Sequence, residues 1–251
     1  MPFTFAHPLY AAPVKRLFPR WISLTGIILG SMSPDFEYFI ALEPYQSIGH
    51  TTKGLFLQAI PLSILFAFLF HYFIKRPLAR NLPSVFGLDR RAYALILPWK
   101  IGGLREALVF LTSVTLGFYS HIGIDAFTHQ SGGFVTQFPI LQQRVLPDLP
   151  GYKLLQYSLS IVGLAAEALI LLVFLFKSKQ PNEHLHSHSS TRKSLYWAVV
   201  FAVTFVTVSI KFAFFSSGNQ LGMLVVSSIS GCSLGLIIAG LIDCVQEKKS
   251  S

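Results

Sequence analysis

The stretch LLQYSLSIVGLAAEALILLVFLF, Leu154–Phe176, decides the fold class of this protein. Its 23 residues contain one charged side chain, Glu167, and are otherwise almost entirely apolar. About 20 mostly apolar residues make a helix long enough to cross the hydrocarbon core of a bilayer. This stretch therefore predicts a membrane-spanning helix.

Further apolar stretches extend this prediction to the whole chain. Four of them meet the same standard of length and composition: Leu55–Ile74, Ala107–Phe127, Leu195–Phe215 and Leu221–Ile242. A weaker one, Trp21–Leu42, is interrupted in its second half by Pro34, Asp35 and Glu37. We expect an all-α, polytopic membrane bundle of five to six segments, in which the first is either spanning or re-entrant.

The composition agrees with lipid as the solvent. Hydrophobic residues make up 52% of the 251 residues and charged residues only 12%, whereas soluble domains carry about a quarter charged residues. The net charge of +9 raises the question of nucleic-acid binding. The basic residues lie beside apolar segments, however, where topology and anionic lipid account for them. We therefore expect membrane lipid as a partner and no nucleic acid.

The distribution of Lys and Arg predicts the orientation. Basic residues gather in Lys75–Arg105, in Lys177–Lys193 and at the C-terminus, so the positive-inside rule places these on the cytoplasmic side. The segments 43–53, 128–153 and 216–220 would then face the opposite side. We further expect the N-terminal helices of 1–133 to carry the functional site and 134–251 to supply C-terminal membrane helices, within one membrane domain.

A His and Asp pattern ends one of the apolar helices. His121, Asp125 and His129 are spaced four residues apart, which places them on one helix face if the helix continues. Imidazole and carboxylate groups are the usual protein ligands of zinc and similar divalent ions. Interfacial polar capping is the simpler reading, but three such residues in a chain so poor in charge favour a metal site.

Two more candidates are predicted on the same side of the membrane. Asp35 follows Pro34, which prevents an ordinary helix interior there, and an unpaired carboxylate is costly in lipid. His50 directly precedes the next apolar helix. Nearby Glu37 is expected either beside the metal ligands or facing solvent. The predicted topology brings Asp35 and His50 to the extracytoplasmic end, together with the His121 motif.

The side of the membrane on which His7 lies is left open by the sequence. A full first span places His7 in the cytoplasm, away from the other candidates. Alternatively, 8–18 dips into the membrane and 21–32 returns, with Lys15, Arg16 and Arg20 at the turn. Each limb has about a dozen residues, which reach only about half way across a bilayer. Such re-entrant segments are tolerated when protein covers them.

Other features give weaker signals. His184, His186 and His188 fall in a polar stretch that we interpret as a solvated loop, and the role of Glu167 stays open between a proton or substrate group and a structural pair. The motifs Gly26-x-x-x-Gly30 and Gly231-x-x-x-Gly235 predict close helix packing.

Several of these motifs resemble those of known families. Met1-Pro-Phe-Thr-Phe-Ala-His-Pro8, Ser33-Pro-Asp-Phe-Glu-Tyr38 and Gly49-His-Thr51 resemble a family of bacterial membrane proteins of unknown function. His121-x-x-x-Asp125-x-x-Thr128-His129 resembles the signature of related inner-membrane metal-dependent hydrolases. The ligand order is also similar to that of zinc-dependent phospholipase C and zinc-dependent single-strand nucleases.

The resemblance implies a metal-dependent hydrolase in the bacterial inner membrane. Its ligand order maps onto six residues of this chain: His7, Asp35, His50, His121, Asp125 and His129. Those enzymes add a later ligand pair that is missing here, so one or two divalent ions, with zinc as the expected metal, are the most that the residues support.

The same resemblance implies catalytic roles for Asp35 and Asp125. Asp125 would bridge metal ions, and Asp35 would be a further ligand or the general base that activates water. The expected substrate is a phosphoester, linked to lipid because the bilayer would deliver it. The alternative is a non-enzymatic transporter or assembly factor whose polar residues line a cavity.

Overall fold

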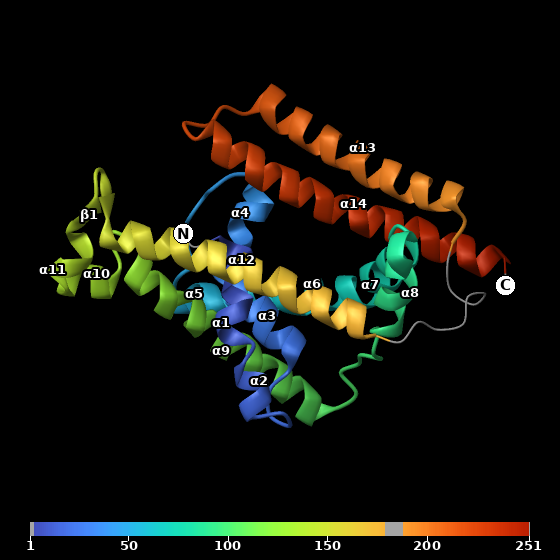
Figure 1. Cartoon of the computed structure of the whole chain (residues 1–251), viewed down its shortest axis with the longest axis horizontal. Coiled ribbons are helices and arrows are strands. Elements are labelled where there is room, and N and C mark those ends of the chain that lie inside the picture. The colour runs from blue at the N-terminus through green and yellow to red at the C-terminus, as the bar shows by residue number, and fades with distance from the viewer. Residues whose placement is uncertain (1–2, 179–187, 251) are drawn as a thin grey trace. The chain divides into compact units, whose positions relative to one another are not determined.

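The computed structural model describes residues 3–178 and 188–250, with side chains up to Glu247. The chain is almost entirely helical, with one short antiparallel pair of strands, β1 (Arg144–Leu146) and β2 (Leu149–Pro150) (Figure 1). It forms two compact units, which are described separately. Unit 1 comprises Met1–Phe36, Ser47–Ile64 and Ile101–Leu171, and unit 2 comprises Glu37–Gln46, Leu65–Lys100 and Leu172–Ser251.

Fourteen α-helices are assigned within the described residues, joined in places by short 3₁₀ and π-helical turns. Most are short, and the long ones carry the apolar stretches predicted above. Their bounds are α1 His7–Ala11, α2 Val14–Leu17, α3 Leu24–Met32, α4 Phe36–Ala41, α5 Thr52–Gly54, α6 Ile60–Leu69, α7 Lys75–Asn81, α8 Leu88–Ala94, α9 Leu104–Thr128, α10 Gly133–Gln137, α11 Pro139–Gln142, α12 Gly151–Lys177, α13 Ser190–Phe214 and α14 Gln220–Ser250.

Five helical segments are long and apolar enough to cross a membrane, which confirms the predicted polytopic fold. They are Thr52–Asn81, Leu104–Gln137, Gly151–Lys177, Ser190–Phe214 and Gln220–Glu247, and each corresponds to one of the five strong apolar stretches. The first of them joins α5, α6 and α7 through π-helical turns at Leu55–Ala59 and Phe70–Ile74.

The weaker stretch Trp21–Leu42 is not among these five segments. It is helical without a break from Leu24 to Ala41, as α3 passes through the 3₁₀ turn Ser33–Asp35 into α4. Pro34, Asp35 and Glu37 make its second half less apolar than a spanning helix. The six-span arrangement is therefore not what the described residues show.

The segment before α3 is folded back in short helices. Between α2 and α3, Lys15 Nζ donates hydrogen bonds to the carbonyl oxygens of Pro19 and Ile22, the latter at 2.7 Å. Lys15 therefore stabilises the turn, because its ammonium group binds two carbonyl oxygens that lie between the helices. This arrangement has the short limbs of the re-entrant alternative.

Close packing of α3 on α9 depends on glycine. A Cβ on Gly30 would lie 2.2 Å from the carbonyl oxygen of Val114, and a Cβ on Gly117 would lie 2.4 Å from that of Ile27. The two helices therefore approach with backbone against backbone, as small residues allow in membrane bundles. Within unit 2, Gly235 of α14 makes the same type of contact with Val200 of α13. The glycine motifs serve packing inside the chain, as predicted.

Unit 2 holds its charged side chains in pairs. Lys193 Nζ lies 2.5 Å from Asp89 Oδ2, and Arg192 Nε donates to Asp243 Oδ1 at 3.0 Å. Asp243 also lies 3.4 Å from His188 Nε2. Pairing offsets the cost of burying these charges between helices.

Candidate metal centre

Four side chains of unit 1 bring ligand atoms together at one point. His121 Nε2 and His50 Nε2 lie 3.2 and 3.3 Å from Asp125 Oδ2. The same two nitrogens lie 3.7 and 3.4 Å from Asp35 Oδ1. Two ligands of a tetrahedral zinc ion, each about 2.0–2.2 Å from the metal, are separated by about 3.3–3.6 Å. The separations of the two imidazole nitrogens from the carboxylate oxygens are close to those found between ligands of a small divalent ion.

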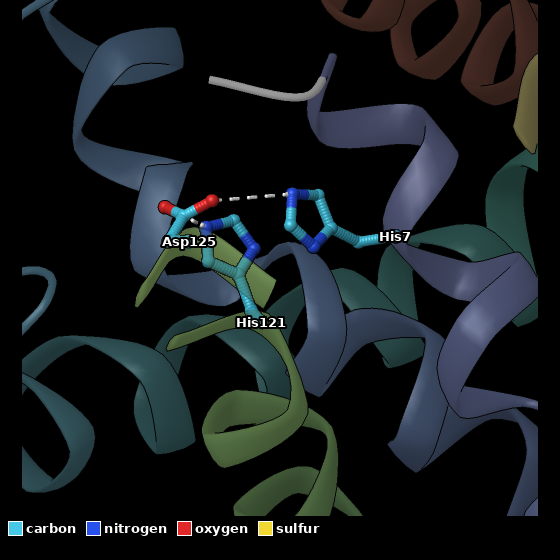
Figure 2. Close-up of side chains that lie close together, drawn as sticks. All are labelled: His7, His121 and Asp125. Atoms are coloured by element: carbon cyan, nitrogen blue, oxygen red, sulfur yellow. Dashed lines mark ion pairs between the residues drawn. The ribbon is translucent and has the colours of Figure 1, made fainter. Parts of the chain in front are cut away.

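His7 and His129 extend the cluster on the other oxygen of Asp125. His7 Nε2 lies 3.8 Å and His129 Nδ1 lies 3.5 Å from Asp125 Oδ1. The rings of His7 and His121 are stacked, with centroids 3.7 Å apart, and Figure 2 shows both beside the Asp125 carboxylate. Ligand atoms of His7, His121 and Asp125 all lie within 4.8 Å of one another, as do those of Asp35, His50 and His121. The structure thus brings His7, Asp35, His50, His121 and Asp125 together in two overlapping groups, and the role of all six residues as ligands stays a prediction.

The close contact between α3 and α9 orients His121. One turn after Gly117, the imidazole Nδ1 of His121 donates a hydrogen bond to the carbonyl oxygen of Ser31 at 2.7 Å. This bond fixes the ring and leaves Nε2 free to face Asp35 and Asp125. Metal-bound histidines usually carry such a hydrogen bond on their second nitrogen.

Asp35 is held by the N-terminal segment. The hydroxyl of Thr4 donates to Asp35 Oδ2 at 2.6 Å, while Oδ1, which faces the two imidazoles, is buried without a hydrogen-bond partner. Burial raises the pKa of the Asp35 carboxyl, so its ionised form needs a positive charge nearby. A metal cation at Oδ1 would supply that charge.

His50 is positioned by a tight loop before the first span. Thr51 caps α5 by accepting a hydrogen bond from the Gly54 N–H at 3.1 Å. A Cβ on Gly54 would lie 2.1 Å from the carbonyl oxygen of Ile48, so only glycine permits this closure. The closed loop brings the His50 ring to the two carboxylates.

His129 lies just beyond the end of α9. Its Nδ1 lies 3.1 Å from the main-chain oxygen of Asp125, which leaves Nε2 buried without a partner. Gly132 then allows the chain to fold back, since a Cβ there would lie 2.4 Å from the carbonyl oxygen of Ala126. The helix face predicted for the motif therefore holds through Asp125, and His129 follows in an extended conformation.

Unsatisfied polar atoms mark the cluster as a site built for a ligand. Each of the six residues has at least one buried side-chain nitrogen or oxygen without a hydrogen-bond partner. His121 Nε2 is among them although Asp125 Oδ2 is only 3.2 Å away. Buried polar groups are otherwise almost always paired, and each unpaired one costs about 1–3 kcal/mol. A cation would satisfy those that face the carboxylates, among them His7 Nε2, His121 Nε2 and Asp35 Oδ1, so the donor set fits a metal.

The protonation state of the buried imidazole of His7 agrees with this fit. Burial, aided by the neighbouring His121, lowers the pKa of His7 to about 3. The ring is therefore neutral at pH 7, and the neutral imidazole is the form that binds metals. The open edge of the cluster lies at His50 and His129, whose side chains are 15% and 28% exposed, while those of His7, Asp35 and His121 are inaccessible.

Other sequence candidates lie elsewhere. Glu37 is buried, which excludes the solvent-facing alternative. His184 and His186 lie outside the described residues, and His188 pairs with Asp243 in unit 2. Thr4 was not among the predicted site residues, although it lies in the N-terminal motif that carries the family resemblance.

Fold and site together define a multi-pass α-helical membrane protein with a buried cluster of His and Asp residues that could hold a metal ion. A family model described as domain of unknown function DUF4184 matches residues 1–242, and the chain belongs to this family. No curated protein and no solved structure matches the chain.

Proposed function

We propose that this protein is a membrane-embedded hydrolase that uses one or two divalent metal ions, zinc in the first instance, to cleave a phosphoester. The observation that carries the proposal is the set of buried nitrogen and oxygen atoms that face one another without hydrogen bonds. His50, His121, Asp35 and Asp125 Oδ2 would hold the first ion. His7 and His129 would hold a second ion together with Asp125.

A bound divalent ion would lower the pKa of water and stabilise charge on a phosphoryl oxygen. The protein would hold the side chains around the ion in a fixed orientation. Ser31 and Thr4 orient His121 and Asp35 by hydrogen bonds. In hydrolysis the water oxygen bonds to phosphorus, the bond to the alcohol oxygen breaks, and the alcohol leaves with a proton. Asp35 would be either a ligand of the ion or the general base that accepts the proton of the attacking water.

The five spans support a common location for all six residues. With Lys75–Arg105, Lys177–Lys193 and the C-terminus on the cytoplasmic side, an odd number of spans puts the residues before Thr52 on the opposite side. The N-terminus, His50 and the end of α9 then share the extracytoplasmic face of the inner membrane. Because Trp21–Leu42 is not counted among the five spans, His7 would lie on the same side as the other five residues. A site at this level would draw a lipid-linked phosphoester from the membrane itself.

The test is hydrolysis by the purified full chain in detergent micelles. The substrates are p-nitrophenyl phosphate, bis(p-nitrophenyl) phosphate and a phosphatidylglycerol mixed micelle, each with added Zn²⁺, Mn²⁺ or chelator. We expect metal-dependent release of product that Asp35→Asn and Asp125→Asn abolish. The matched control is Asp148→Asn, since that carboxylate is fully exposed in the turn between β1 and β2.

The outcomes separate the alternatives. Metal retention by the wild type without hydrolysis of any of these esters would favour the non-enzymatic transporter or assembly factor. Absence of bound metal after purification and zinc supplementation would overturn the metal centre altogether.

A further inference from the structure

Glu167 is a carboxylate within the third apolar span, α12. A charged side chain at such a position is costly in lipid and is usually retained for function. Its side chain is half-buried, and Oε1 is buried without a hydrogen-bond partner. The backbone of Leu9 and the side chain of Tyr10, both in the short helix α1, lie near this carboxylate. Glu167 is therefore close to the first turn of α1, where backbone N–H groups lack partners within the helix.

Glu167 lies on the face of α12 that packs against the N-terminal segment. Ser160, Gly163 and Glu167 are three and four residues apart, so they lie along one side of α12. The backbone N–H of Phe3 donates to Ser160 Oγ at 2.9 Å. A Cβ on Gly163 would lie 2.6 Å from the Cβ of Ala6. The N-terminal segment is therefore in direct contact with this face of α12.

A further bond closes the contact beyond His7. The hydroxyl of Tyr10 donates to the carbonyl oxygen of Leu159 at 2.6 Å. The segment is thus tied to α12 on both sides of His7, at Phe3 and Ala6 before it and at Leu9 and Tyr10 after it. His7 itself is inaccessible to solvent and turns its ring to His121 and Asp125.

We propose that Glu167 is a positioning residue, which seats α1 on α12 and thereby holds His7 in the metal cluster. The inference rests on the metal site of the proposed function. Glu167 acts through His7 and touches neither metal nor substrate.

The carboxylate explains why glutamate stands in an otherwise apolar helix. Its oxygens can accept hydrogen bonds from backbone N–H groups of this turn. Glutamine keeps an acceptor of nearly the same shape, and leucine removes it. The proposal therefore predicts a graded loss, small in Glu167→Gln and large in Glu167→Leu.

The first measurement is the affinity of the full chain for Zn²⁺ in detergent. We expect Glu167→Leu to weaken binding about 10- to 100-fold, the usual effect of removing a group that orients a ligand. In a His7→Ala background the same substitution should cause no further loss, because the ligand through which Glu167 acts is gone. Equal losses in both backgrounds would overturn the proposal.

The second measurement does not depend on metal. Hydrogen–deuterium exchange of the peptide covering residues 3–11, with chelator present, should be faster in Glu167→Leu, intermediate in Glu167→Gln and unchanged in Glu106→Gln. Glu106 is the matched control, an exposed glutamate at the start of α9. Unchanged exchange in this peptide, or faster exchange throughout the chain, would refute the positioning role. Faster exchange confined to this peptide, in a protein that binds no zinc, would support the contact between Glu167 and α1 and would reject the metal centre.

Discussion

Replacing Asp125 with asparagine should remove the metal while preserving the shape of the site. Oδ2 of Asp125 lies 3.2 Å from His121 Nε2 and 3.3 Å from His50 Nε2, and Oδ1 lies 3.8 Å from His7 Nε2. The carboxylate thus faces histidines on both sides. An amide has nearly the same volume, so packing is kept while the negative charge is lost.

The magnitude follows from the position of Asp125 at the centre of the cluster. Loss of a group that only orients a ligand typically costs about 10- to 100-fold in metal affinity. Loss of a direct ligand should lower the metal affinity by at least the upper value, which is about 100-fold or about 2.8 kcal/mol in binding free energy. At a free metal concentration of about 100 times the wild-type Kd, metal stabilises the wild type by about 2.7 kcal/mol and such a variant by about 0.4 kcal/mol.

Two assays measure this difference. Elemental analysis of purified protein should find bound zinc in the wild type and in Asp148→Asn, and little in Asp125→Asn. Thermal unfolding with and without chelator should show a metal-dependent rise of Tm in the first two proteins and almost none in the third. Equal metal content and equal Tm shifts in all three would refute the assignment of Asp125 as a ligand.

Three further predictions follow from other parts of the molecule. His7→Ala should lower the zinc content of the purified protein, and elemental analysis measures it. His71→Ala is the control and should not lower it, because His71 stacks on a tryptophan in unit 2. Equal zinc content in both variants would show that His7 is not a ligand. Gly30→Ala should lower the stability to thermal unfolding by about 1–3 kcal/mol, because its Cβ would lie 2.2 Å from the carbonyl oxygen of Val114, and an unchanged Tm would contradict that close approach. A reporter fused after Ser251 should be active only in its cytoplasmic form, and periplasmic activity would contradict the proposed orientation.

The spacing of His121 and Asp125 could be interpreted from sequence because a helix places residues four apart on one face. This spacing argument does not say on which side of the membrane His7 lies, because that side depends on whether Trp21–Leu42 crosses the membrane. Hydropathy alone leaves that open, because the stretch is apolar but broken at Pro34. In the structure α3 passes through a 3₁₀ turn at Ser33–Asp35 into α4, and this segment is not among the five that are long and apolar enough to cross. The division into 1–133 and 134–251 stays a prediction.

The sequence by itself determined the class of fold and the candidate residues. Long apolar stretches can be satisfied in lipid only by closing their backbone hydrogen bonds in helices, and rare His and Asp residues in such a chain stand out. Only the tertiary structure decided that His7, Asp35, His50 and His121 meet, because this depends on contacts between distant segments. The close approach of α3 to α9 at Gly30 and Gly117 and the hydrogen bond from Thr4 to Asp35 are properties of packing, which local periodicity does not encode.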